Sequence, residues 1–126
     1  MVQADISQLS GECNTWRESL RSYRDEINQL KQRLQHIVAQ NLSKDQLQDV
    51  EHYHNQFHIQ LINVHDLKQS IKAHDRRVNF EMAAHSGQLS EETVAEHEQL
   101  FEEYQALNLT LQSLREKFSS FLNRTS

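Results

Sequence analysis

The chain contains no proline and only two glycines, Gly11 and Gly87, among its 126 residues. Folds that reverse direction often, such as β-sandwiches and β-barrels, use both residue types to supply the dihedral angles of their turns. A chain with so few turn-forming residues is expected to consist of a few long helices joined by short connections. The residue content therefore favours an all-α fold.

Composition indicates helices that bury only one side. Hydrophobic residues make up 37% of the chain and charged residues 25%, and the mean hydropathy is −0.80. This balance is typical of amphipathic helices that each bury one apolar stripe and expose the rest to water. The length suits one domain, so we expect a single three-helix domain over residues 1–126.

The clearest periodic pattern lies in the first third of the chain. Apolar residues recur there at alternating spacings of three and four residues, which is the a/d pattern of a coiled coil. The positions are Ile6, Leu9, Cys13, Trp16, Leu20, Tyr23, Ile27, Leu30, Leu34 and Ile37. The pattern predicts a helix over residues 4–40.

A capping motif marks the start of the second helix. The Ser43 hydroxyl can accept a hydrogen bond from the Gln46 amide, while the Gln46 side chain reaches back to the Ser43 amide. The helix is predicted over residues 44–85, with Gly87 in the left-handed position that ends it. Its predicted heptad frame is Leu47, Val50, His54, Phe57, Leu61, Val64, Lys68, Ile71, Asp75, Val78, Met82 and His85.

Ser90 is expected to cap a third helix over residues 91–123, with Glu91 and Glu92 in its first turn. The seam of this helix is predicted to consist of Leu100, Tyr104, Leu107, Leu111, Leu114, Phe118 and Phe121. Both connections are short enough to make neighbouring helices antiparallel. The sequence thus predicts an antiparallel, up-down-up three-helix bundle with coiled-coil-like heptad packing.

Several of these features resemble the spectrin repeat, a family of three-helix bundles. The resemblance is carried by Trp16, the stretch from Val64 to Val78, the turn from Ser86 to Glu92, Leu100 and Tyr104. It covers about half of the chain. Tyr104 stands where the family has a tryptophan, and the first helix is longer than in the family. The resemblance implies a similar architecture and no particular activity.

Charge and cysteine content narrow the classes of function. The 13 basic and 18 acidic residues give a net charge of −5, whereas nucleic-acid-binding domains usually carry a basic surplus. Cys13 is the one cysteine, so no intramolecular disulfide can form. No apolar run approaches the ~20 residues that span a bilayer, and the N-terminus lacks the pattern of a secretion signal. We therefore expect a cytoplasmic protein that binds neither nucleic acid nor membrane.

Catalytic motifs are not found in the sequence. No glycine-rich phosphate loop and no nucleophile elbow occur, so we expect neither an organic cofactor nor enzymatic activity. Cys13 lies in the apolar stripe beside Trp16, where a small buried side chain is the expected role.

The second predicted helix carries candidate metal ligands. Glu51, His54 and His58 are spaced so that all three project from one face, and their groups bind transition-metal ions. They support the alternative hypothesis of a ferritin-like or hemerythrin-like metal-binding bundle. A purely structural role, with half-exposed histidines hydrogen-bonded to neighbouring helices, is the competing interpretation. A third hypothesis is that protonation of the histidines in mild acid loosens this helix.

Lys68 is expected at the level of Trp16 and Asn108. Its ammonium group could lie over the indole and form a polar layer with Asn108. The competing interpretation buries only the aliphatic stem and leaves the charge in solvent.

The hypothesis that we favour from the sequence is a non-enzymatic protein–protein interaction or self-association module. Ile59, Ile62 and Phe80 lie on faces that an isolated bundle would expose, and Phe101 broadens the apolar stripe of the third helix. Surplus apolar surface of this kind often marks association, although looser packing would bury part of it. The expected partner is another protein or a second copy of this chain in a homodimer.

Overall fold

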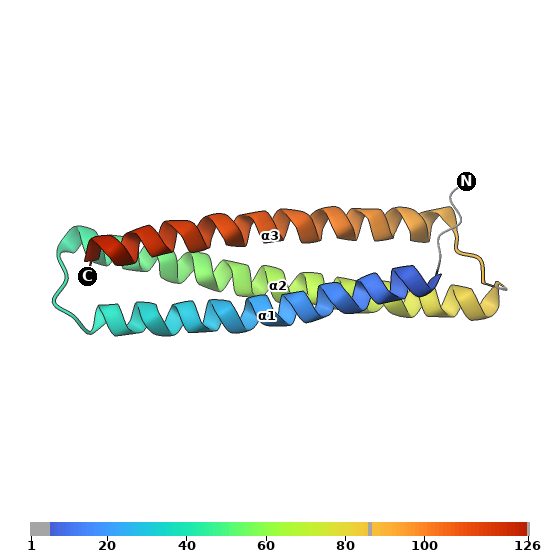
Figure 1. The fold of residues 1–126 in the computed structure, drawn as a ribbon, viewed down its shortest axis with the longest axis horizontal. Coiled ribbons are helices and arrows are strands. Elements are labelled where there is room, and N and C mark those ends of the chain that lie inside the picture. The colour runs from blue at the N-terminus through green and yellow to red at the C-terminus, as the bar shows by residue number, and fades with distance from the viewer. Residues whose placement is uncertain (1–5, 86, 126) are drawn as a thin grey trace.

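The computed structural model of the chain describes residues 6–85 and 87–125, with only the backbone described for Ile6 and Ser7. The described residues form three long helices, α1 (Ile6–Val38), α2 (Lys44–Ala84) and α3 (Glu91–Thr125). The helices pack side by side along their length (Figure 1). The connection from α1 to α2 lies at one end of the molecule, and the connection from α2 to α3 lies at the other end.

The helix ends observed at residues 38, 44, 84, 91 and 125 lie within two residues of the predicted ones. The predicted start at residue 4 lies outside the described residues, as does Ser86. Helix α2 begins with the predicted capping box, in which Ser43 and Gln46 exchange hydrogen bonds of 3.2 and 2.8 Å. Gly87 has a φ of +85°, as expected for the left-handed residue after a helix.

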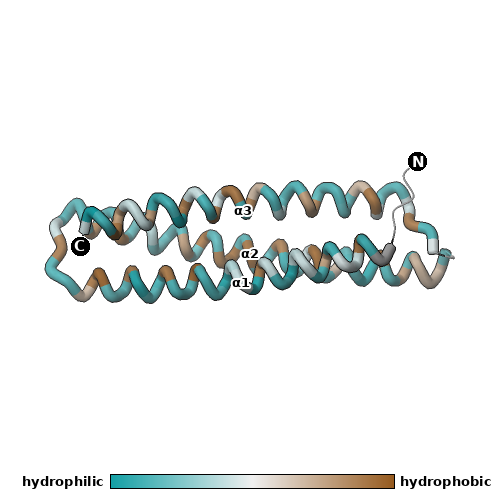
Figure 2. The backbone as a smooth tube through the Cα atoms, in the orientation of Figure 1, coloured by the Kyte–Doolittle hydropathy of each residue, from teal (hydrophilic) through white to brown (hydrophobic). Residues whose placement is uncertain are grey.

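The residues predicted for the seams of α1 and α3 lie away from solvent. Every predicted seam residue on these helices whose side chain is described is buried or half-buried. Hydrophobic residues recur along all three helices with hydrophilic residues between them (Figure 2). On α3 the buried stripe continues toward the helix N-terminus through His97 and Thr93. Within the described part of the chain, no helix has an apolar stretch suited to crossing a membrane.

Alternate positions of the predicted heptad frame of α2 are buried as expected. At most of the other positions, the buried residue is the one directly before the predicted residue. The buried series is Val50, Tyr53, Phe57, Gln60, Val64, Leu67, Ile71, His74, Val78 and Glu81. The prediction had placed His54, Met82 and His85 in the seam, and the structure exposes all three, as it does Leu47. A helix in a three-helix bundle faces two neighbours, so adjacent positions compete for the interior. Leu61, Lys68 and Asp75 are half-buried for this reason.

Aromatic packing decides the frame at the end where α1 joins α2. The Tyr53 ring packs against Phe57, Phe118 and Phe121, with ring centroids 5.1–6.2 Å apart. The Tyr53 hydroxyl donates a hydrogen bond of 3.0 Å to the carbonyl oxygen of Lys117. The Tyr53 ring can be buried because its hydroxyl group has a hydrogen-bond partner inside the protein. The adjacent His54 remains in solvent.

The two glycines lead to opposite predictions. Gly11 lies inside α1 and Gly87 follows α2, and a Cβ atom at either position would meet no atom within 4 Å. Gly11→Ala is expected to raise the free energy of unfolding by ~0.5–1 kcal/mol, because alanine loses less backbone entropy in a helix. Gly87→Ala is expected to lower it by ~1 kcal/mol, because the left-handed conformation strains an L-residue. Urea unfolding of both variants measures these changes, and shifts in the same direction would contradict the prediction.

Candidate functional site

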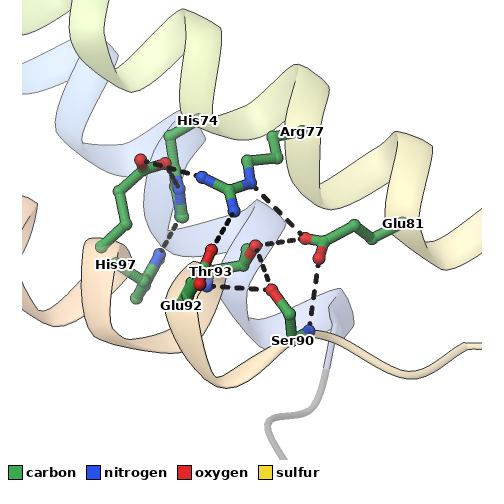
Figure 3. Close-up of polar contacts among 8 residues, drawn as sticks. His74, Arg77, Glu81, Ser90, Glu92, Thr93 and His97 are labelled. Carbon is green, nitrogen blue, oxygen red and sulfur yellow. Dashed lines mark hydrogen bonds and ion pairs between the residues drawn. The ribbon is translucent and has the colours of Figure 1, made fainter.

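The interior changes from apolar to polar toward the end where α2 joins α3. His74 and Glu81 of α2 and Thr93 and His97 of α3 are all buried there. Figure 3 shows their side chains pointing toward each other between the two helices. Buried polar groups are costly unless they are hydrogen-bonded. Among the described side chains, every buried nitrogen and oxygen atom has a hydrogen-bond partner.

The two imidazoles are bonded to each other and each to a carboxylate. His74 Nε2 lies 2.9 Å from His97 Nδ1. The other nitrogen of His74, Nδ1, lies 2.6 Å from Glu96 Oε1. The other nitrogen of His97, Nε2, lies 2.9 Å from Glu12 Oε2. The resulting chain of carboxylate, imidazole, imidazole and carboxylate connects α2 and α3 to Glu12 on α1.

Cys13 of α1 lies beside the histidine pair. Its Sγ atom and one ring nitrogen each of His74 and His97 all lie within 4.8 Å of one another. Cys13 is completely buried, as predicted from its place in the α1 stripe. Burial raises the pKa of the thiol to about 11, and the carboxylate of Asp75 adds to this rise. The thiol is consequently protonated at neutral pH.

Trp16 of α1 packs against the ring of His97. Its ring centroid lies 4.7 Å from that of His97, 5.8 Å from that of Phe101 and 5.9 Å from that of Tyr104. Trp16 itself is buried, while Phe101 keeps one side in solvent. The aromatic group thus shields the His97 ring from water.

Lys68 is half-buried, and its charged neighbours lie mainly on α1. Loss of solvation is the largest cause that lowers the pKa of Lys68, and the positive charges of Arg21 and Arg24 lower it further. Of the two alternatives for Lys68, the polar layer with Asn108 is not among the described hydrogen bonds, in which the Tyr23 hydroxyl donates to Asn108 Oδ1 at 2.7 Å. Trp16 has its ring contacts with α3.

Glu81 ties the end of α2 to the start of α3. Its carboxylate accepts hydrogen bonds from the Ser90 amide, at 3.3 Å, and from the Thr93 hydroxyl (Figure 3). The hydrogen bond from the Thr93 hydroxyl is the largest cause that lowers the pKa of Glu81, followed by one from the Ser90 side chain. The ionised carboxylate therefore stabilises the folded chain.

The predicted ligands Glu51, His54 and His58 lie on α2, away from the histidine pair, and all three are exposed. Glu51 and His54 line a groove between α1 and α2 that also includes Val38. Among the residues that the structure describes, the three that bring metal-binding atoms together are Cys13, His74 and His97 instead. A metal site at Glu51, His54 and His58 stays a prediction.

The four predicted interface residues are exposed, but they do not form one patch. Ile59 and Ile62 lie one turn apart on α2, and each is just under half exposed. Phe80 is 70% exposed but follows Ile62 by about 27 Å along the helix axis, at 1.5 Å per residue. Phe101 lies on α3 and stacks on Trp16. The structure therefore brings Ile59 and Ile62 together and leaves the other two separate.

The sequence contains a periodic signal for the burial of both histidines. His97 continues the α3 stripe by one step before Leu100, and His74 lies between Ile71 and Val78 in the alternate frame of α2. Periodicity could have placed each imidazole in the interior. It could not show that the two rings meet, because that depends on the alignment of two helices along their axes.

Comparison with known proteins finds no matching family model, no similar curated protein and no similar solved structure. The resemblance to the spectrin repeat therefore stays a prediction from the sequence.

Glu81→Gln tests the hydrogen-bonded connection. Since folding lowers the pKa of Glu81 below 4.5, its carboxylate stabilises the fold above about pH 4.5, and this contribution is lost as the pH falls through the lower folded-state value. We expect Glu81→Gln to lower the free energy of unfolding by about 1–3 kcal/mol at pH 7. The difference from the parent should shrink in acid, as measured by urea unfolding at several pH values.

Glu92→Gln is the matched control. Glu92 also forms an ion pair with Arg77, at 3.5 Å, but its side chain is 87% exposed. Exposed pairs contribute less than about 1 kcal/mol, so this variant should unfold almost like the parent at every pH. Equal losses in the two variants would contradict a special role for the buried carboxylate.

Proposed function

We propose that the protein is a non-enzymatic, cytoplasmic bundle of antiparallel, up-down-up helices with coiled-coil-like packing, and that it acts by protein–protein association. The contact surface in this proposal is the exposed face of α2 around Ile59 and Ile62. The architecture would then be similar to that of a spectrin repeat.

The observation that carries the proposal is an uncharged, partly aliphatic stretch in the middle of α2. Residues 52–65 contain no aspartate, glutamate, lysine or arginine, although 25% of the chain is charged. Ile59 and Ile62 lie in this stretch with 45% and 46% of their surface exposed. The centres of protein interfaces are depleted of charged residues, because desolvating a charge opposes binding. An exposed helix face with this composition is suited to being covered.

Leu109 of α3 extends this surface across a groove. Leu109 is 64% exposed and lines the same groove between α2 and α3 as His52 and Gln56. Ile59 follows Gln56 by one turn of α2, so it lies next to that groove. We call Ile59, Ile62 and Leu109 the association face.

A second copy of this chain is the partner that we propose for the association face. Two copies repel each other through their net charge of −5 each. The middle of α2 brings no formal charge into the contact, so the repulsion is smallest where this face meets itself. A two-fold dimer uses the same surface on both copies, which requires a self-complementary face of this kind.

The double variant Ile59→Asp/Ile62→Asp tests this assignment. The parent is expected to have twice the chain mass of 14.9 kDa in light scattering. The variant should have the single-chain mass, because each aspartate would place a charge in the contact. We expect its dissociation constant to rise at least ~100-fold, equivalent to ~3 kcal/mol.

Phe80→Asp is the control for this experiment. Phe80 is an exposed apolar residue of the same helix outside the association face, so its replacement should leave the dimer mass unchanged. A parent protein that is monomeric at every concentration would refute the proposal. So would a dimer that the double variant preserves and Phe80→Asp dissociates.

A further inference from the structure

We propose that Cys13, His74 and His97 form a binding site for a zinc-type divalent transition-metal ion, a role separate from the proposed association. Each of the three helices contributes one of these residues, and all three are buried. One thiolate and two imidazoles are ligands that zinc and related ions prefer. A metal ion at this position would connect the three helices through a single centre.

The ligand atoms are close to the spacing that such an ion requires. Zinc binds nitrogen at 2.0–2.1 Å and sulfur at 2.3 Å, so the two nitrogens of a tetrahedral site lie about 3.3 Å apart. His74 Nε2 and His97 Nδ1 are 2.9 Å apart, and Cys13 Sγ lies within 4.8 Å of the ligand atoms of both. Small side-chain rotations can therefore form the site without a change in the fold.

The carboxylates of Glu12 and Glu96 are placed to support these ligands. Each lies against the nitrogen of His97 or His74 that faces away from the other ring. Metal-binding histidines usually donate their second N–H to a carboxylate or carbonyl, which orients the ring and makes it a better ligand. Here both rings already have this partner, which leaves the nitrogen of each ring that faces the other ring as the candidate ligand atom.

Cobalt titration of the metal-free, reduced protein tests the site. Co²⁺ substitutes for Zn²⁺ and produces a thiolate-to-cobalt absorption band when a cysteine binds it. The single tryptophan, Trp16, lies 4.7 Å from the His97 ring, so Co²⁺ should also quench its fluorescence. We expect one equivalent of Co²⁺ to produce both signals, and Zn²⁺ to reverse both. Zn²⁺ should also raise the melting temperature.

Cys13→Ala is the main variant, with its melting temperature without metal as the check on folding. It should lose the absorption band and bind at least ~10-fold more weakly. Glu96→Gln changes a partly exposed side chain and should weaken binding ~10–100-fold while retaining the band. This second variant keeps the test decisive if Cys13→Ala does not fold.

His54→Ala/His58→Ala is the matched control, since both histidines lie on α2 but are exposed. This variant should bind Co²⁺ like the parent. The proposal is refuted if the parent shows no saturable absorption band. It is also refuted if Cys13→Ala binds as tightly as the parent, or if the control variant loses binding. The Ile59→Asp/Ile62→Asp variant should still bind one equivalent, which separates this result from the association test.

Discussion

The hydrogen bond between His74 and His97 is the constraint on which the alignment of the bundle depends. Apolar heptad seams are similar from one heptad to the next, so they resist sliding only weakly. Two buried imidazoles behave differently, because a shift along the axis would leave their polar atoms without partners inside the protein. The bond from His97 to Glu12 extends the same constraint to α1. This one set of hydrogen-bonded polar residues thus aligns all three helices, as polar residues do in coiled coils.

The two ends of the molecule stabilise the fold through different kinds of interaction. At the end where α1 joins α2, Tyr53, Phe57, Phe118 and Phe121 form a packed aromatic cluster that contributes buried apolar area. The other end also buries polar groups, and each of these among the described side chains is hydrogen-bonded, so they contribute specificity more than area. The proposed metal site belongs to the polar end. The proposed association face around Ile59 and Ile62 is exposed, so either proposal can be tested without disturbing the other.

Helix α2 shows where prediction from the sequence reached its limit. The alternate positions Val50, Phe57, Val64, Ile71 and Val78 were correctly predicted to be buried. The remaining positions in either frame mix polar and apolar residues, so hydropathy alone did not decide between them. Tyr53 and Glu81 lie inside because the Lys117 carbonyl and the Thr93 hydroxyl, both on α3, satisfy their polar atoms.

The sequence by itself determined the three helices, their ends and the apolar stripes of α1 and α3. These features depend on residues that are near one another in the chain, such as Ser43 with Gln46, and on a period that one helix sets alone. The tertiary structure decided which polar residues of α2 are buried and that Cys13, His74 and His97 meet. Their meeting depends on the alignment of three helices, which arises from contacts between residues as far apart as Glu12 and His97.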